Sequence, residues 1–234
     1  MTATVIIPTT GSGELYKAID SVLSQTYMVK CYVVCDGEKY FTQTKEIVDK
    51  FKSRDLQVCY LPENVGSNGF YGHRVYAAFT HLINSEYVLY LDQDNWFEPN
   101  HVMSCVDTIR KTNSDWSYSL RKIVDKSGEF ICNDYCESLG KWKCFQDYHH
   151  VDTNCYCIKT DVAIKVATMF HGGWGQDRIF FNVLSTHKPK FECTGDTTVN
   201  YRLAGNAGSV KDDFFKIGND VMMKQYNGKL PWLK

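Results

Sequence analysis

The stretch YVLYLDQD, residues 87–94, decides the fold of this chain. Five apolar or aromatic residues run directly into two aspartates, Asp92 and Asp94, which one residue separates. A continuous apolar run of this length is typical of a strand that is buried on both faces. Two carboxylates at the end of such a strand can share one hard divalent cation, and their oxygen atoms favour Mg²⁺ or Mn²⁺. The alternative is an Asp-rich turn that holds no metal.

Length and composition limit the classes of protein that need considering. The chain has 234 residues, enough for one large α/β domain or two small ones, and it is 44% hydrophobic and 14% aromatic. Its formal net charge is −1, so it lacks the basic excess of a nucleic-acid-binding protein. No segment approaches the roughly 18 consecutive apolar residues of a membrane span, and the first residues lack the pattern of a signal peptide. We therefore expect a cytoplasmic protein with no membrane span and no nucleic-acid partner. The sequence leaves open its oligomeric state and whether it is part of a longer parent chain.

Ten cysteines are many for a cytosolic protein. Cys132, Cys136 and Cys144 lie close together in the sequence, but no CxxC pair is present. This spacing favours reduced structural thiols over a zinc site or disulfides. His149 and His150, which follow this region, keep a zinc site open as the alternative.

The first hundred residues alternate between strand and helix patterns, and the second half is less regular. We expect strands at residues 4–7, 31–35, 58–61 and 87–91, and helices at residues 14–23, 42–52, 72–82 and 102–109, with Leu82 facing inward. In the second half we expect strands at residues 115–120 and 150–158, a helix at residues 176–184, and extended segments at residues 190–193 and 197–203. Alternation of this kind predicts an α/β fold with a mostly parallel, doubly wound sheet.

Polar segments follow each of the four strands predicted in the first half. They are residues 8–10, 36–37, 63–69 and 92–94. In an open α/β sheet, ligands bind beyond the carboxyl ends of the strands. Because four polar segments converge on this one edge, the sequence predicts a binding site there.

At this point the chain resembles the family-2 glycosyltransferases with the GT-A fold. The resemblance rests on VIIPTT (residues 5–10), AIDSVLSQTY (18–27), YVVCDG (32–37), ENVGSNGFYGHR (63–74) and YLDQDNW (90–96), in this order. Beyond residue 100 it rests on GGWGQDRIF (172–180) and VNYRLAGNAGS (199–209). It implies a single Rossmann-like GT-A domain over residues 1–234, with a smaller mixed sheet on the acceptor side. Residues 1–100 would form its nucleotide-sugar-binding half and residues 101–234 its acceptor-binding half.

The resemblance also implies roles for individual residues. Asp94 would be the main protein ligand to Mn²⁺ or Mg²⁺, with Asp92 close to both the metal and the ribose, and Asp36 would meet the base. The residues expected to bind the nucleotide-sugar donor are Pro8, Thr9, Thr10, Asp36, Asn64, Gly66, Arg74, Asp92 and Gln93. UDP is favoured as the nucleotide by the habit of the family. The residues expected to bind the acceptor are Gly173, Trp174 and Gln176.

Two departures from the family pattern concern the donor site. Cys35 stands where the family often has the first of two acids before a glycine. Ala204 stands where a histidine often reaches the metal, two residues after an arginine. The third metal ligand is therefore left open between Asn206 and water.

Sugar transfer also needs a base that removes the proton of the acceptor hydroxyl, and Asp177 is the candidate. It lies in the first turn of the predicted helix, where the helix dipole favours an ionised carboxylate. An aspartate in a first turn is also common for stability alone, so the motif match carries the assignment. A base on the far face of the sugar implies direct displacement with inversion. Trp174 either stacks on an acceptor sugar or is an ordinary packed tryptophan.

Three other functions were weighed against this one. A nucleotidyltransferase would need an arginine in a glycine-rich loop after the first strand, and GSGELY (residues 11–16) is followed by none nearby. A dinucleotide-dependent oxidoreductase would need G-x-G-x-x-G, and the third glycine is missing. An inactive nucleotide- or sugar-binding module would not need Asp92, Asp94 and Asp177 together. The sequence thus predicts a metal-dependent, inverting glycosyltransferase that moves one sugar from a nucleoside-diphosphate sugar to a hydroxyl of a glycan or another acceptor.

Overall fold

The computed structural model describes residues 2–203 and 210–233, and within them nine strands form one sheet. The strand order is β3-β2-β1-β4-β8-β6-β9-β5, and β7 pairs with β6. The strands are β1 (Ala3–Thr9), β2 (Val29–Asp36), β3 (Leu56–Leu61), β4 (Tyr87–Tyr90), β5 (Trp96–Phe97), β6 (Trp116–Val124), β7 (Phe130–Asn133), β8 (Tyr156–Lys159) and β9 (Phe191–Arg202).

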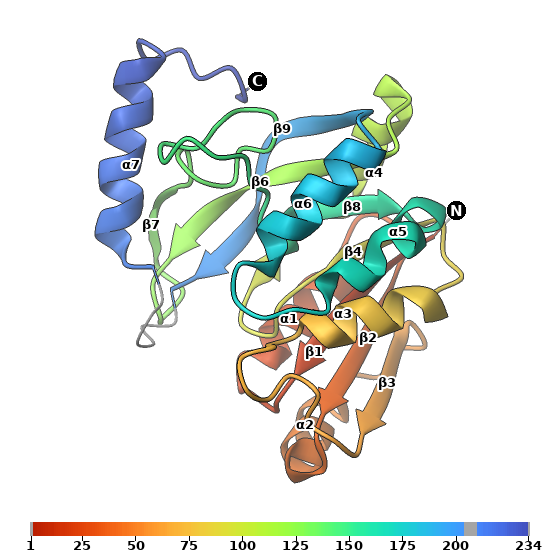
Figure 1. Ribbon diagram of the computed structural model, residues 1–234. Helices are drawn as coiled ribbons and strands as arrows, with labels where there is room; N and C mark the ends of the chain where they lie inside the picture. Colours follow the sequence, from red (N-terminus) through yellow and green to blue (C-terminus); the bar gives the residue numbers. More distant parts are fainter. Residues whose placement is uncertain (1, 204–209, 234) are drawn as a thin grey trace.

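Helices cover this sheet and follow the amphipathic patterns of the sequence. They are α1 (Leu15–Leu23), α2 (Phe41–Val48), α3 (His73–Phe79), α4 (His101–Thr112), α5 (Thr160–Val166), α6 (Gln176–His187) and α7 (Asp212–Gln225). Figure 1 shows α3, α5 and α6 in front of the sheet, with α7 beside the strands of the second half. No helix among the described residues has the length and apolar character that crossing a membrane would require.

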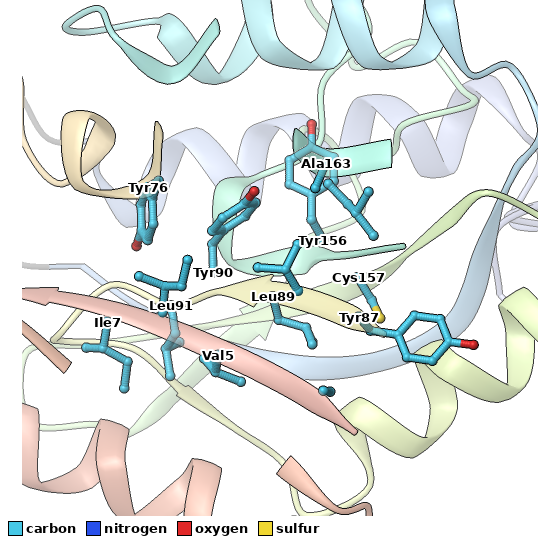
Figure 2. Close-up of a cluster of buried hydrophobic side chains, with 14 of the residues drawn as sticks. Val5, Ile7, Tyr76, Tyr87, Leu89, Tyr90, Leu91, Tyr156, Cys157 and Ala163 are labelled. Carbon is cyan, nitrogen blue, oxygen red and sulfur yellow. The ribbon is translucent and has the colours of Figure 1, made fainter. Parts of the chain in front are cut away.

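β4 lies at the centre of the sheet, as its apolar run predicts. Its residues and Leu91 are each at most 2% exposed. Tyr90 and Tyr156 lie on the side of the sheet that carries Tyr76 and Ala163, where the tyrosine rings pack against α3 and α6 (Figure 2). Because both faces of β4 are covered, its carboxyl end delivers Asp92 and Asp94 to an edge with fixed geometry.

The sheet is parallel in the first half and mixed in the second. β1 pairs in parallel with both β2 and β4, and β2 pairs in parallel with β3. β8 runs antiparallel to both β4 and β6, whereas β6 and β9 are parallel. The mixed part expected on the acceptor side is therefore present, continuous with the parallel part, and the predicted α/β fold class is confirmed.

Three expectations about individual elements were wrong. Residues 150–158 were expected to form one strand, but β8 begins at Tyr156, because the preceding side chains turn toward the site. The extended segments at residues 190–193 and 197–203 are one strand, β9, bent at Gly195, whose φ is 74°. Leu82 is 61% exposed instead of buried, because α3 ends at Phe79 and a 3₁₀ turn follows.

The sequence did not predict the strands β5 and β7 or the helix α5. It also left the structure of the C-terminal residues open, and these residues form α7. α7 contributes Phe215 and Met222 to a second apolar cluster, together with Leu120 and Ile123 of β6. The ten cysteines carry free thiols, and seven of them are buried. In the described part of the chain no group of three or more His, Cys, Asp or Glu side chains is arranged to hold a metal ion.

Candidate active site

A cavity of about 560 Å³ lies at the carboxyl ends of the first-half strands and extends toward α6. Of the residues predicted from the sequence, those that line it are Pro8, Thr9, Thr10, Asp36, Asn64, Gly66, Asp92, Gln93, Asp94, Trp174 and Asp177. The expected convergence of polar segments on one sheet edge is thus confirmed. A volume of this size suits a small-molecule ligand.

Gln93 ties the segment after β1 to the segment after β4. Its Oε1 accepts hydrogen bonds from the Thr9 hydroxyl at 2.6 Å and from the Thr10 amide at 3.0 Å. The Ser12 amide donates to the same oxygen at 3.3 Å. These contacts fix the rim of the cavity. The Gln93 side chain therefore has a structural role, because it holds residues 9–12 against the segment after β4.

Asp36 organises the segment after β3. Its two carboxylate oxygens accept hydrogen bonds from the amides of Val65 and Gly66, both at 2.8 Å. A Cβ at Gly66 would lie 2.0 Å from the Tyr71 carbonyl oxygen, so only glycine fits there. The carboxylate at the end of β2 therefore sets the shape of this wall of the cavity.

Asp92 is held by partners on both its backbone and its side chain. The Asp92 amide donates to Asn154 Oδ1 at 2.7 Å, and Asn154 Nδ2 donates to Asp92 Oδ2 at 2.9 Å. The Tyr76 hydroxyl donates to Asp92 Oδ1 at 2.8 Å. Burial and the nearby Asp152 carboxylate raise the pKa of Asp92, against these hydrogen bonds.

The surroundings of Asp94 destabilise its ionised carboxylate, and a bound cation would offset this effect. Burial, followed by the charge of Asp92, raises the pKa of Asp94 to about 6. Arg202 donates to the Asp94 backbone carbonyl at 3.0 Å, and its charge lowers the pKa of the Asp94 carboxyl by less than burial and Asp92 raise it. Two neighbouring carboxylates that resist ionisation are a donor set that fits a divalent cation. Ala204 and Asn206, where a third ligand was considered, lie outside the described residues.

Asp177 lies in the first turn of α6, after a turn at Gly175 with φ 78°. Its Oδ1 accepts the Arg178 amide at 2.8 Å, and its Oδ2 lies 3.5 Å from His150 Nε2. The His150 side chain is 3% exposed, and that of Asp177 is 29% exposed. The Asp177 carboxylate is therefore held by the Arg178 amide and by His150, and its exposed part faces the cavity.

The rim of the cavity near α6 is aromatic and cationic. Trp174 is 77% exposed, so the alternative of a packed tryptophan is excluded. The Arg178 guanidinium lies 5.5 Å from the Trp174 ring and 4.2 Å from the Tyr148 ring. Arg178 also donates to the Tyr148 hydroxyl at 2.9 Å. Trp174 thus presents a free aromatic face to anything that enters the cavity beside Asp177.

The sequence profile of glycosyl transferase family 2 matches residues 4–151, more than half of the chain. The chain belongs to this family. No curated protein sequence matches it. The family assignment makes the protein a glycosyltransferase, and it accounts for the position of the cavity at the carboxyl ends of the parallel strands.

Solved structures similar to this family-2 glycosyltransferase include TarS from S. aureus. Residues 1–349 of TarS match with a TM-score of 0.68 and 16% identity, over 99% of this chain and 67% of that one. The same part of TarS in complex with UDP-GlcNAc matches with a TM-score of 0.67 and 17% identity, over 99% and 68%. The longer TarS structure matches with a TM-score of 0.62 and 15% identity over 99% of this chain, which spans 41% of it. At these identities the likeness shows the fold.

Three residues assigned to substrate binding do not line the cavity of this family-2 enzyme. Arg74 stacks on the Phe70 ring with its guanidinium carbon 3.4 Å from the centroid. A Cβ at Gly173 would lie 2.7 Å from the Gly69 carbonyl oxygen, so this glycine permits close backbone packing. Gln176 is 6% exposed, and its amide donates to the Met169 carbonyl.

Sequence reasoning missed a buried ionic cluster on the side of the cavity that the second half of the chain forms. Arg121, which is 2% exposed, pairs with Asp134 at 2.8 Å and with Glu137 and Asp152. Three of these residues, Arg121, Glu137 and Asp152, line the cavity together with His150, Arg178, Tyr201 and Phe215. Only the apolar surroundings of Arg121 in β6 hinted at an internal ion pair, since a buried charge requires partners.

Proposed function

We propose that this glycosyltransferase moves one sugar from a nucleoside-diphosphate sugar to a hydroxyl of a glycan or another acceptor, with Mn²⁺ or Mg²⁺ and with inversion at the anomeric carbon. The observation that carries the proposal is that one cavity holds the paired carboxylates at the end of β4 and the carboxylate of Asp177 at the start of α6. The paired carboxylates of Asp92 and Asp94 could hold a metal ion at the diphosphate of the donor. The carboxylate of Asp177 could accept the proton of the acceptor hydroxyl.

Asp94 and Asp92 would hold the metal ion. When bound, the ion would neutralise the diphosphate charge that leaves with the nucleotide. The raised pKa of Asp94 supports this assignment, because burial and the neighbouring charge of Asp92 destabilise its ionised form, and a bound cation would offset both effects. Water or substrate oxygen atoms would complete the coordination, as is usual for Mg²⁺.

Asp177 would accept the proton of the acceptor hydroxyl. Its carboxylate faces the cavity at the start of α6, where it could accept a proton from a hydroxyl bound in the cavity. A base that acts on the acceptor while the nucleotide leaves from the opposite face gives inversion in a single displacement. The exposed ring of Trp174 would support the apolar face of an acceptor sugar.

UDP is the nucleotide that we propose for the donor. The support is the fold shared with the TarS structures that hold UDP and UDP-GlcNAc. Asp36 at the end of β2 keeps the segment 63–69 in the form that lines this side of the cavity. The base would lie against this wall.

The test is a calorimetric and thermal-shift screen of UDP-, GDP-, dTDP- and CDP-sugars, each with Mn²⁺ and with EDTA. Asp94→Asn is compared with the wild type, and Asp20→Asn, at an exposed aspartate of α1, is the matched control. We expect one nucleotide class to bind in the presence of Mn²⁺ to the wild type and to Asp20→Asn but not to Asp94→Asn. If no nucleotide sugar binds under either condition, the proposal is wrong.

A further inference from the structure

The irregular segment of residues 148–154 runs along the acceptor side of the cavity, between the two groups to which we assign the chemistry. Tyr148, His150, Asp152 and Asn154 alternate along it, and each has a polar contact within the site. Of the residues between them, His149 contacts the Gly140 carbonyl and Val151 is fully buried in the main core. Thr153 also lines the cavity.

Asn154 binds the donor-side carboxylate. It accepts from the Asp92 amide and donates to Asp92 Oδ2, so a single amide group fixes both the backbone and the carboxylate of Asp92. Asn154 Nδ2 also donates to Asp152 Oδ1 at 2.7 Å. Asp152 in turn is paired with the buried Arg121. The orientation of the Asn154 amide is therefore determined, because its donor side faces two carboxylates.

His150 approaches the acceptor-side carboxylate from the protein interior. Its Nε2 lies 3.5 Å from Asp177 Oδ2. Its Nδ1 is buried and has no hydrogen-bond partner among the described residues. A ring with its proton on Nε2 leaves Nδ1 as an unpaired acceptor, which costs less than leaving a buried N–H without a partner. His150 then faces Asp177 as a donor.

We propose that residues 148–154 are a positioning segment that sets the spacing between the donor-side carboxylate Asp92 and the base Asp177, with Asn154 orienting the first and His150 the second. The inference rests on the proposed function and adds two positioning residues to it. The segment is anchored in the core at its middle by Val151 and directly after its end by Cys155, so the positions of His150 and Asn154 are fixed relative to one another. A misplaced reactive group loses rate even when the group itself is intact.

The two ends of the segment give separable readouts. The probe is UDP-GlcNAc with Mn²⁺, measured by calorimetry for the Kd and by UDP release to water for kcat. Asn154→Ala is expected to weaken Mn²⁺-dependent binding by about 10- to 100-fold, as the loss of an outer partner of a metal ligand does. His150→Phe is expected to leave the Kd near the wild-type value and to lower kcat by about tenfold or more.

Conservative and structural controls separate positioning from loss of fold. His150→Gln places an N–H donor near the former Nε2 and should restore much of kcat. Asn154→Ser, measured in parallel with Asn154→Ala, keeps one short polar group and should fall between that variant and the wild type. Val106→Ala opens a core cavity in α4, outside the segment, so it should lower Tm while leaving the Kd and kcat near their wild-type values.

Each outcome has a distinct meaning. If the wild type neither binds nor hydrolyses UDP-GlcNAc with Mn²⁺, the proposed donor is wrong. If the wild type is active and the Asn154 and His150 variants match Val106→Ala in the Kd and kcat, the positioning segment is overturned. It is equally overturned if His150→Phe weakens donor binding as much as Asn154→Ala does.

Discussion

The carboxylate of Asp94 illustrates a conflict between stability and function at a single residue. Burial and Asp92 raise its pKa to about 6, above the ordinary value of 3.8. The folded state therefore binds the proton more tightly than the unfolded state. The stability that this preference contributes is complete below pH 3.8 and is lost as the pH rises through about 6. At pH 8, in the absence of metal, the ionised Asp94 carboxylate destabilises the folded state.

Asp94→Asn should therefore stabilise the metal-free protein at pH 8, by on the order of 1–3 kcal/mol, while removing Mn²⁺-dependent donor binding. Near pH 4 the gain should largely vanish, because wild-type Asp94 is already protonated there. Urea unfolding at the two pH values in EDTA measures the effect, with Asp20→Asn as the control. An equal gain at both pH values would contradict the assigned pKa.

Trp174 is a residue whose exposure argues for a ligand. Because it is 77% exposed, its removal costs the fold little. Trp174→Ala should change the free energy of unfolding by less than about 0.5 kcal/mol. Its effect should appear in the KM for a glycan acceptor, which should rise by about tenfold if the ring stacks on a sugar. Trp174→Phe keeps an aromatic face and should retain part of the affinity. An unchanged acceptor KM in Trp174→Ala would exclude the stacking role.

At the scale of elements, the structure shows what the segment SVLSQT does. The segment is residues 21–26 and spans the end of α1 and the residues that follow it. Gln25 Nε2 donates to the Ser21 carbonyl at 2.9 Å and to the Glu98 carbonyl at 2.8 Å. Its Oε1 accepts from the Val102 amide, in the first turn of α4, at 2.9 Å. One side chain therefore joins the end of α1 to the start of α4 and to the turn between β5 and α4.

Gln25→Leu should destabilise the protein by about 1–3 kcal/mol, because the Val102 amide and two carbonyls lose their partner together. Gln43→Leu, at an exposed position of α2, is the matched control and should stay within about 0.5 kcal/mol of the wild type. Chemical unfolding measures both. If the two variants behave alike, Gln25 does not join these elements.

Elements of the first half were predictable because each carries its own pattern. The apolar run of β4 and the amphipathic stripe of α1 report burial directly. The alternation of polar and apolar residues in the first part of residues 150–158 has the period of two that strands share, and it predicts a strand there. In the structure the alternation instead turns polar side chains toward Asp92 and Asp177. Local sequence cannot distinguish these outcomes, because the deciding partners lie 27 to 62 positions away in the chain.

At the scale of the whole molecule, Arg121 holds together the acceptor side of the cavity. β6 supplies the arginine, the residues after β7 supply Asp134 and Glu137, and the positioning segment supplies Asp152. Asp134 is buried, which alone would raise its pKa, yet Arg121 and the amides of Cys136 and Glu137 hold that pKa below the ordinary value. Its contribution to stability is thus present above pH 3.8 and is lost as the pH falls through the lowered pKa.

Arg121→Met removes the cation and leaves three carboxylates in or near the core. The expected loss at pH 8 is about 3–5 kcal/mol, since breaking one side of a buried ion pair leaves uncompensated charge. The carboxylates of the variant gain stability by binding protons, so the gap to the wild type should narrow at pH 5. Lys122→Met is the control in the same strand, because Lys122 pairs with Glu98 at 2.6 Å with both side chains about one-third exposed, and such a pair contributes about 0–1 kcal/mol. Urea unfolding of the wild type and both variants at pH 8 and pH 5 measures these losses in stability. A loss in Arg121→Met that is small, or that does not shrink at pH 5, would mean that the cluster does not hold this side of the cavity together.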